Sequence, residues 1–418
     1  MRKKILLIGA DGFVGSHLYS SFKRKLSGQY DVAGTCFIEN FNNELFKLDI
    51  KNSNDLEKSI RTIMPKFIIL IAGNKDLKSC EQNFSEAAAI NIKPTEYIIN
   101  ILKKHSVPSK LVYLSTDYVF DGLTGLYSEN SIPKPVTNYG KTKLGAENLL
   151  IESDIDYKII RSSALMSRGG LFFDWLIEAL KKKTKLKMFD NVFFSPTPME
   201  LFCNAFCRII ENYENIKGNI IHLCGNKRFS RYEFALLIQN HMHNSHTEII
   251  PVEENLTNSI FQKDLSMIPS TFIEKLQNKT IESYFEDEIK LIKIIPRYLN
   301  HADSRGKLEG LINFGNWKEL NMIVSNTGTV RGNHYHTYTT ELFIILDGLI
   351  EITAQQIKNM RLCGSTETYT VKSGDVIRIK PYINHAFKII KQARWINILS
   401  HKIDAEKPDI SRFPQKFN

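Results

Sequence analysis

The sequence contains no long apolar run. Among its 418 residues, no stretch approaches the ~18 consecutive apolar residues that a membrane-spanning helix requires. The apolar segment near the start, Ile5–Ile8, is short and leads into a glycine-rich turn, where a signal peptide would have its cleavage site. We therefore interpret this segment as a buried strand and expect no membrane partner.

Paired cysteines and basic blocks are also missing. The six cysteines are scattered, and no two of them form a CxxC pair, which argues against a disulfide framework or a thiolate zinc site and favours a cytoplasmic protein. The formal net charge is +10, but Lys and Arg are interleaved with Asp and Glu. We therefore do not expect a nucleic-acid partner. A polyanionic small substrate such as a nucleotide diphosphate suits the charge better, and the remaining alternative is that mild basicity only aids solubility.

The composition is that of a folded protein with more than one domain. Hydrophobic residues make up 43% and charged residues 24%, which excludes disordered, collagen-like and coiled-coil classes. At ~100–200 residues per domain, the length predicts two or three domains. There is no internal repeat and no low-complexity segment.

The pattern of apolar residues changes once along the chain. Over 1–150, short apolar runs such as Phe67–Ala72 alternate with stretches of helical spacing such as Phe84–Lys104, which is typical of βα units on a parallel sheet. From Leu308 onward, short alternating strands are separated by Gly, Asn and Pro. The sequence predicts a Rossmann-type doubly wound α/β domain over 1–292 and an all-β sandwich or barrel over 300–418, with the boundary near Pro296–Asp303.

A glycine-rich turn follows the first expected strand and opens a helix. Its GxxGxxG spacing lets Gly9 form the tight turn, lets Gly12 bring the backbone close to a pyrophosphate, and lets Gly15 pack the helix on the strand. The choice between NAD and NADP stays open, because the second strand ends near Cys36 without an acid, and Glu39 is the nearest one. Asp49 and Ile50 could position an adenine ring. The candidate cofactor residues of the turn are Gly9, Asp11, Gly12, Phe13, Val14 and Gly15.

A second group of residues predicts proton transfer to a carbonyl. Tyr139 and Lys143 are four residues apart and therefore on one face of a helix. Free tyrosine is a poor acid at neutral pH, and we expect the Lys143 ammonium to lower the pKa of Tyr139 so that its phenol can pass a proton to a ketone oxygen. Lys143 can also hold a nicotinamide ribose, and Thr116, at the end of a strand, can hydrogen-bond the same ketone oxygen.

These motifs resemble those of extended short-chain dehydrogenases/reductases, nearest in pattern to the dTDP-4-dehydrorhamnose reductase family. The resemblance rests on STDYVFDG at 115–122, YGKTKLGAE at 139–147, SPTP at 195–198 and SRYEFA at 230–235. It implies reduction of the C4 ketone of a nucleotide-diphosphate sugar with NAD(P)H, NADPH being favoured. It also implies Thr116, Tyr139 and Lys143 as catalytic residues. The cofactor contacts that it implies are Asp11–Val14, Asp49, Ile50, Ile71, Ala72 and Gly73, although the usual Asn-Ala-Ala of the family is Ile71-Ala72-Gly73 here.

The last quarter of the chain contains a candidate metal site. His334 and His336 alternate on one expected strand and so point to one face, Glu341 follows a short turn, and His385 comes from a later strand. Three imidazoles and one carboxylate suit a divalent metal with an open position. We expect zinc, with Mn, Fe and Ni as alternatives that ligand type does not exclude.

The spacing of these four residues resembles that of a cupin, a jelly-roll barrel. The segment RGNHYH at 331–336 is similar to the C-terminal cupin of capsular polysaccharide synthesis proteins that join a reductase to a zinc cupin. The resemblance implies C3 epimerisation of a 4-keto sugar nucleotide before C4 reduction, and a homodimer. Alternatives are a 3,4-ketoisomerase, a 3,5-epimerase, a non-catalytic dimerisation module, or a dinucleotide-binding regulatory subunit. The nucleotide, the sugar and the product configuration stay open.

Overall fold

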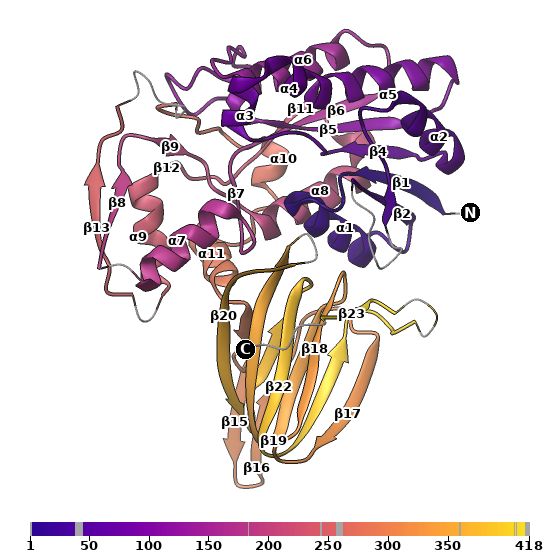
Figure 1. Cartoon of the computed structure of the whole chain (residues 1–418). Coiled ribbons are helices and arrows are strands. Elements are labelled where there is room, and N and C mark those ends of the chain that lie inside the picture. Colours follow the sequence, from indigo (N-terminus) through magenta and orange to yellow (C-terminus); the bar gives the residue numbers. More distant parts are fainter. Residues whose placement is uncertain are drawn as a thin grey trace. The chain divides into compact units, whose positions relative to one another are not determined.

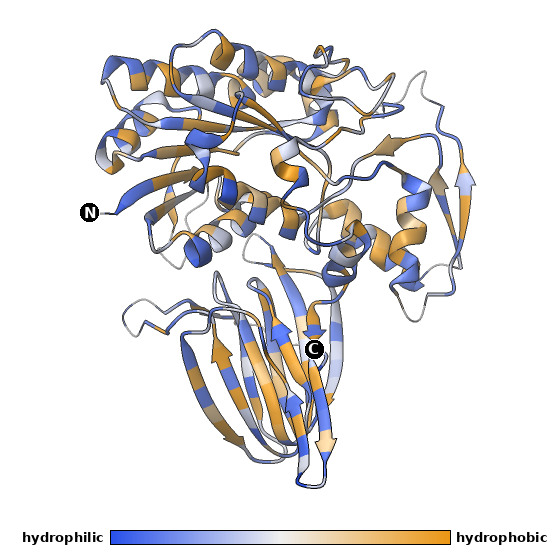
Figure 2. Cartoon of the chain, turned by 180° about the vertical axis from the view of Figure 1, so that it is seen from behind, coloured by the Kyte–Doolittle hydropathy of each residue, from blue (hydrophilic) through white to orange (hydrophobic). Residues whose placement is uncertain are grey.

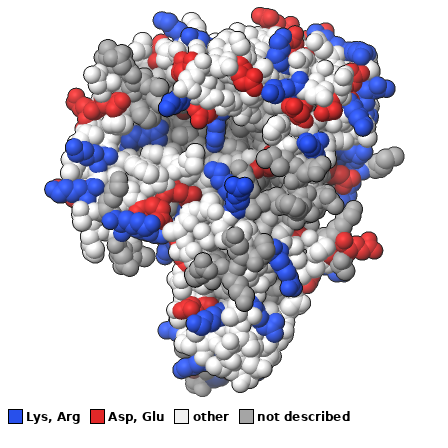
Figure 3. Space-filling view, in the orientation of Figure 1, with Lys and Arg blue, Asp and Glu red and all other residues white. Residues whose placement is uncertain are grey.

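The chain divides into two units, Met1–Ile289 and Lys290–Asn418. The computed structural model, drawn in Figure 1, describes residues 2–37, 45–182, 184–242, 245–255, 262–358, 361–404, 406 and 408–413. None of the described helices is both long and apolar enough to cross a bilayer. On the visible face of the first unit, Lys and Arg alternate with Asp and Glu without forming a single-sign block (Figure 3).

The first unit is built on a parallel sheet of seven strands. Its order, β11-β6-β5-β4-β1-β2-β3, has β1 and β4 adjacent at the point where the direction of strand addition reverses. This confirms the predicted Rossmann-type sheet. The strands are β1 (Lys3–Ile8), β2 (Tyr30–Cys36), β3 (Leu45–Lys47), β4 (Phe67–Leu70), β5 (Lys110–Thr116), β6 (Tyr157–Ser162) and β11 (Ile220–Leu223).

Helices cover both faces of this sheet. Along β1, Ile5 and Leu7 belong to one core, whereas Leu6 and Ile8 belong to the core of the opposite face, and all four side chains are fully buried. The first core is shared with α1 and α8, and the second with α2, α5 and α6. The helices are α1 (Phe13–Lys25), α2 (Ser53–Ile63), α3 (Leu77–Gln82), α4 (Phe84–Asn91), α5 (Lys93–Lys104), α6 (Asn138–Ile151) and α8 (Met199–Glu211).

One expected helix is two helices in the structure. The helical spacing over Phe84–Lys104 predicts a single element, but α4 ends at Asn91 and α5 begins at Lys93. Pro94 explains the break, because proline lacks an amide hydrogen and is tolerated in the first turn of a helix but not in its interior.

The remainder of the first unit combines short strand pairs with four helices. Phe173, Phe234 and Phe285 form an aromatic core there, with Phe234 and Phe285 edge to face at 5.0 Å between ring centroids. The pairs are β7 (Leu165–Met166) with β10 (Thr197–Pro198), β8 (Lys185–Phe189) with β13 (Glu248–Val252), and β9 (Phe193–Phe194) with β12 (Phe229–Ser230); the helices are α7 (Leu171–Lys182), α9 (Arg231–Asn240), α10 (Thr271–Glu274) and α11 (Ile281–Ile289).

The second unit is all-β, and all the strand pairings described in it are antiparallel, which confirms the predicted class. Along its strands apolar and polar residues alternate (Figure 2), and Phe343, Phe387 and Trp395 pack in its core. Its strands are β14 (Ile292–Ile294), β15 (Leu299–Asp303), β16 (Gly306–Gly310), β17 (Glu319–Ser325), β18 (Val330–His336), β19 (Glu341–Lys358), β20 (Arg361–Lys372), β21 (Val376–Ile379), β22 (Ile383–Leu399) and β23 (Ile410–Arg412).

Two boundaries in this unit differ from expectation. The stretches Glu341–Leu346 and Leu349–Thr353, expected as separate strands, are parts of one strand, β19, because register shifts around Gly348 bend the strand without ending it. The division of the chain falls before residue 290, earlier than the expected Pro296–Asp303, because Ile292–Ile294 pairs with β21.

The close packing of α1 on the glycine turn generates a stability prediction. A Cβ placed at Gly15 would lie 1.9 Å from the carbonyl oxygen of Gly9, so α1 would have to move. Gly15→Ala should lower the free energy of unfolding by about 1–3 kcal/mol, measured by denaturant titration. Gly28→Ala is the control, because nothing lies within 4 Å of a Cβ at that position. Equal stability of the two variants would contradict this packing.

Candidate active site and candidate metal site

The turn between β1 and α1 leaves backbone groups at the start of the helix available to a ligand. Gly9 has a φ of 95°, which a residue with a side chain rarely adopts, and its amide donates to the Thr35 hydroxyl at 3.0 Å. Gly12 is the N-cap of α1, and no side chain caps that helix. An uncapped helix N-terminus after such a turn suits a phosphate group. Asp11 accepts a hydrogen bond from the amide of Phe37 at 2.9 Å.

A cavity of about 770 Å³ opens beside this turn. Four of the predicted cofactor residues, Phe13, Val14, Ile71 and Gly73, line it together with all three predicted catalytic residues. It lies at the carboxyl end of the sheet, where ligands of doubly wound folds bind. Among the described residues, the lining does not include the other predicted cofactor residues, Gly9, Asp11, Gly12, Gly15, Asp49, Ile50 and Ala72.

The predicted cofactor residues that do not line the cavity make contacts within the protein. A Cβ at Gly9 would lie 2.9 Å from the backbone of Ala72, so these two residues are in close contact. Asp49 accepts a hydrogen bond from the amide of Lys51 at 2.9 Å, and Ile50 packs against a core of the sheet. Glu39, the acid nearest the end of β2, lies outside the described residues.

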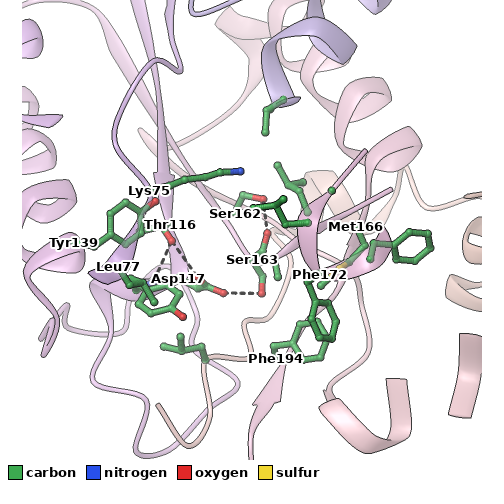
Figure 4. A pocket seen from close by; sticks show the side chains of 18 of the residues that line it. Lys75, Leu77, Thr116, Asp117, Tyr139, Ser162, Ser163, Met166, Phe172 and Phe194 are labelled. Carbon is green, nitrogen blue, oxygen red and sulfur yellow. Dashed lines mark hydrogen bonds between the residues drawn. The ribbon is translucent and has the colours of Figure 1, made fainter. Parts of the chain in front are cut away.

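Thr116 starts a chain of hydrogen bonds along one wall of the cavity. It is the last residue of β5, and its hydroxyl donates to Asp117 at 3.0 Å, while Ser163 donates to the other carboxylate oxygen at 2.7 Å (Figure 4). Burial raises the pKa of Asp117 to about 6, although both hydrogen bonds oppose this. Sequence reasoning named Thr116 but missed Asp117 and Ser163, although Asp117 stands inside the STDYVFDG motif.

Tyr139 comes from α6 and lies beside Thr116 (Figure 4). The prediction that Lys143 lowers the pKa of Tyr139 is wrong for the protein alone: burial raises the pKa of Tyr139, and hydrogen bonding with Thr116 only partly offsets that rise. The Lys143 amine donates to the Leu114 carbonyl at 2.7 Å. Burial lowers the pKa of Lys143 to about 7, against the opposing charge of Glu147.

A buried ion pair holds α6 against the sheet. Arg161 on β6 donates to Glu147 on α6 at 2.7 Å, and both side chains are fully buried. Ser115, next to Thr116, also donates to Glu147. Sequence reasoning did not assign these residues, although Glu147 ends the YGKTKLGAE motif and follows Lys143 by one helical turn.

In the second unit, three of the four predicted metal ligands converge. Ligand atoms of His334, Glu341 and His385 all lie within 4.8 Å of one another. His385 Nε2 and Glu341 Oε2 face each other at 2.9 Å without hydrogen-bond alignment, and neither has a hydrogen-bond partner among the described residues. Two buried polar atoms of this kind fit a shared cation, because imidazole and carboxylate are ligands of zinc and related divalent metals.

His336 stands beside this trio and not within it. Its Nε2 is 3.6 Å from Glu341, and its Nδ1 is 3.6 Å from Asp409, whose carboxylate accepts backbone hydrogen bonds from Thr337 and Thr339. Asp409 therefore fixes the turn that joins His336 to Glu341. Sequence reasoning did not predict its contribution, because 72 and 70 residues separate Asp409 from Thr337 and Thr339 of this turn.

The ionisation of His334 and Glu341 suits metal binding. Burial and the neighbouring His385 lower the pKa of His334 to about 3, so its imidazole is neutral. Burial would raise the pKa of Glu341, but His385 and His336 hold it well below its usual value. A neutral imidazole and an ionised carboxylate are the forms that ligate metals.

Fold and sites together define a dinucleotide-fold α/β unit joined to an antiparallel β unit with a histidine–carboxylate cluster. The chain belongs to the RmlD substrate binding domain family, whose model matches residues 2–285. Residues 301–410 match the model described as Polysaccharide biosynthesis C-terminal domain.

Three relatives illustrate the range of similar proteins. The chain is 28% identical over 240 residues to dTDP-4-dehydrorhamnose reductase of Aggregatibacter actinomycetemcomitans, covering 56% of this chain and 78% of the relative. It is 24% identical over 270 residues to methionine adenosyltransferase 2 subunit beta of Bos taurus, and the match covers 60% of this chain and 76% of the relative. The crystal structure of dTDP-4-dehydrorhamnose reductase from Bacillus anthracis in complex with NADP shares the fold, with a TM-score of 0.59 and 23% sequence identity. The match covers 69% of this chain and 99% of the crystallised chain.

Proposed function

We propose that the first unit is an NADPH-dependent reductase of the C4 ketone of a nucleotide-diphosphate sugar, acting in the synthesis of polysaccharide precursors. The observation that carries the proposal is the placement of Tyr139 beside Thr116, in one cavity with Phe13 and Val14 of the phosphate-binding turn. The similar reductases, one of which was crystallised with NADP, support it. When bound, the nicotinamide supplies the hydride.

The roles of the side chains follow from their positions. The phenol of Tyr139 passes its proton to the ketone oxygen as that oxygen gains charge. The Thr116 hydroxyl, which donates to Asp117 in the protein alone, turns to donate its hydrogen bond to the same ketone oxygen when the substrate is bound. Because burial raises the pKa of Tyr139, the phenol stays protonated until the reaction demands its proton. Lys143 is four residues along the same helix and is proposed to hold the nicotinamide ribose.

A regulatory role without catalysis is the alternative for this unit, since some of the similar proteins are named as a subunit of methionine adenosyltransferase. The pairing of Tyr139 with Thr116 favours catalysis, because a protein that only binds dinucleotide needs neither group beside a cavity. The expected homodimer remains a prediction.

Replacing Tyr139 by Phe tests the reductase. Tyr139→Phe removes the acid but almost none of the packing, so NADPH consumption with a 4-keto sugar nucleotide should fall about 10²–10⁴-fold while NADPH affinity stays the same. The rate is followed by NADPH absorbance and the affinity by calorimetry. Tyr97→Phe, on α5 and outside the cavity lining, is the matched control. Normal turnover by Tyr139→Phe would refute the assigned acid.

For the second unit we propose a cupin that epimerises the 4-keto sugar nucleotide at C3 before the reduction. The trio His334, Glu341 and His385 carries this proposal, and His336 is the candidate fourth ligand. These residues would hold a divalent metal, for which zinc is favoured, and a metal bound there would supply Lewis acidity for a ketone. A proton next to a ketone can be removed once the resulting enolate is stabilised. A 3,4-ketoisomerase, a 3,5-epimerase and a non-catalytic dimerisation module remain alternatives.

Removing a proposed ligand tests this second activity. His385→Ala should lose bound metal, measured by mass spectrometry of the protein's metal content, and should lose deuterium uptake at C3 of the substrate in heavy water, because both need the imidazole at that position. His301→Ala, in the exposed β15–β16 hairpin, is the control and should keep both. Unchanged metal content and deuterium uptake in His385→Ala would exclude the proposed centre.

A further inference from the structure

The SRYEFA motif places an arginine at the wall of the first unit's cavity. Ser230 caps α9, and Arg231 is the first residue of that helix. Its guanidinium carbon lies 4.0 Å from the ring centroid of Phe194 and 4.8 Å from that of Phe172, and all three residues line the cavity. In the view of Figure 4, these two rings lie on the opposite side of Asp117 and Ser163 from Tyr139.

The guanidinium of Arg231 lies over two aromatic rings. Among the residues that the structure describes, its side chain makes two contacts with aromatic rings and no hydrogen bond or ion pair. Burial lowers the pKa of Arg231, which reflects the cost of removing its charge from water. The side chain is only partly buried, so the guanidinium is accessible to an anion that enters the cavity it lines.

The charged residues that line the cavity also favour an anionic ligand. Its lining includes three cationic residues, Lys75, Lys187 and Arg231, together with Lys143, whose pKa burial lowers to about 7, and one acid, Asp117. Asp117 is already bound to Thr116 and Ser163 and forms no ion pair with Arg231 in the described chain, although the two charges interact. The cavity therefore favours a ligand of negative charge.

We propose that Arg231 is a specificity residue that binds an anionic oxygen group of the substrate through its planar fork of donors. That group is either a phosphate of the diphosphate linkage or a carboxylate carried by the sugar, and both are groups that guanidinium binds in bidentate fashion. The inference rests on the proposed function only in taking the cavity as the site of a sugar nucleotide.

The test measures binding to the full-length protein by calorimetry, without turnover. The probes are dTDP, UDP, GDP and CDP, the corresponding uncharged nucleosides, and the pair UDP-glucuronate and UDP-glucose. Arg231→Met keeps the length and apolar packing between the two rings but removes the charge. It should weaken the affinity for the anionic probes about 10- to 100-fold and leave the affinity for nucleosides unchanged. Arg231→Lys should restore part of the affinity for the anionic probes.

The pattern of losses identifies the anionic group. Weaker binding of the diphosphates assigns Arg231 to the diphosphate linkage, whereas weaker binding of UDP-glucuronate alone assigns it to a sugar carboxylate. Arg228→Gln is the charge-matched control, because Arg228 pairs with Asp264 at 2.7 Å and does not line the cavity.

Two results would overturn the proposal. One is equal affinity of Arg231→Met and the unaltered protein for every anionic probe, and the other is that the unaltered protein binds none of them. Failure of the reductase assignment would be seen separately, as absent NADPH binding or absent turnover in a protein that still binds anions through Arg231.

Discussion

The position of α6 against β5 and β6 is the constraint on which the proposed chemistry depends. Thr116 is placed by the register of β5, but Tyr139 reaches it only if the helix is held at one depth and rotation. The buried Glu147–Arg161 pair and the hydrogen bond from Lys143 to Leu114 fasten that helix to the sheet. Breaking a buried pair of this kind leaves an uncompensated charge, so the helix is held in one position relative to the sheet.

Local patterns in the sequence were enough to predict the architecture. The alternation of short apolar runs with helical spacing predicted the parallel sheet, because strands buried on both faces are continuously apolar. The glycine spacing predicted the turn. The physical reason is that the backbone of the helix contacts the end of the preceding strand, so Gly15 has no room for a side chain. The antiparallel second unit followed from its alternating strands and frequent turns.

What the sequence did not reveal depends on contacts between distant residues. Asp409, near the end of the chain, lies beside His336 and holds the adjoining turn, and no local pattern indicates that contact. The direction of the Tyr139 pKa shift depends on burial, which spacing alone does not measure. Arg231 was noticed only as part of a motif; its packing over Phe172 and Phe194 at the cavity wall is visible only when the residues around it are placed.

Transfer of label from the cofactor to the sugar would show the proposed reduction at the carbon where it takes place. NADPH carrying deuterium at both C4 positions of the nicotinamide would be mixed with the protein and a panel of 4-keto sugar nucleotides, and the product examined by NMR. We expect one deuterium bound to C4 of the product sugar. Oxidation of NADPH without deuterium at that carbon, or no oxidation with any of these ketones, would contradict it.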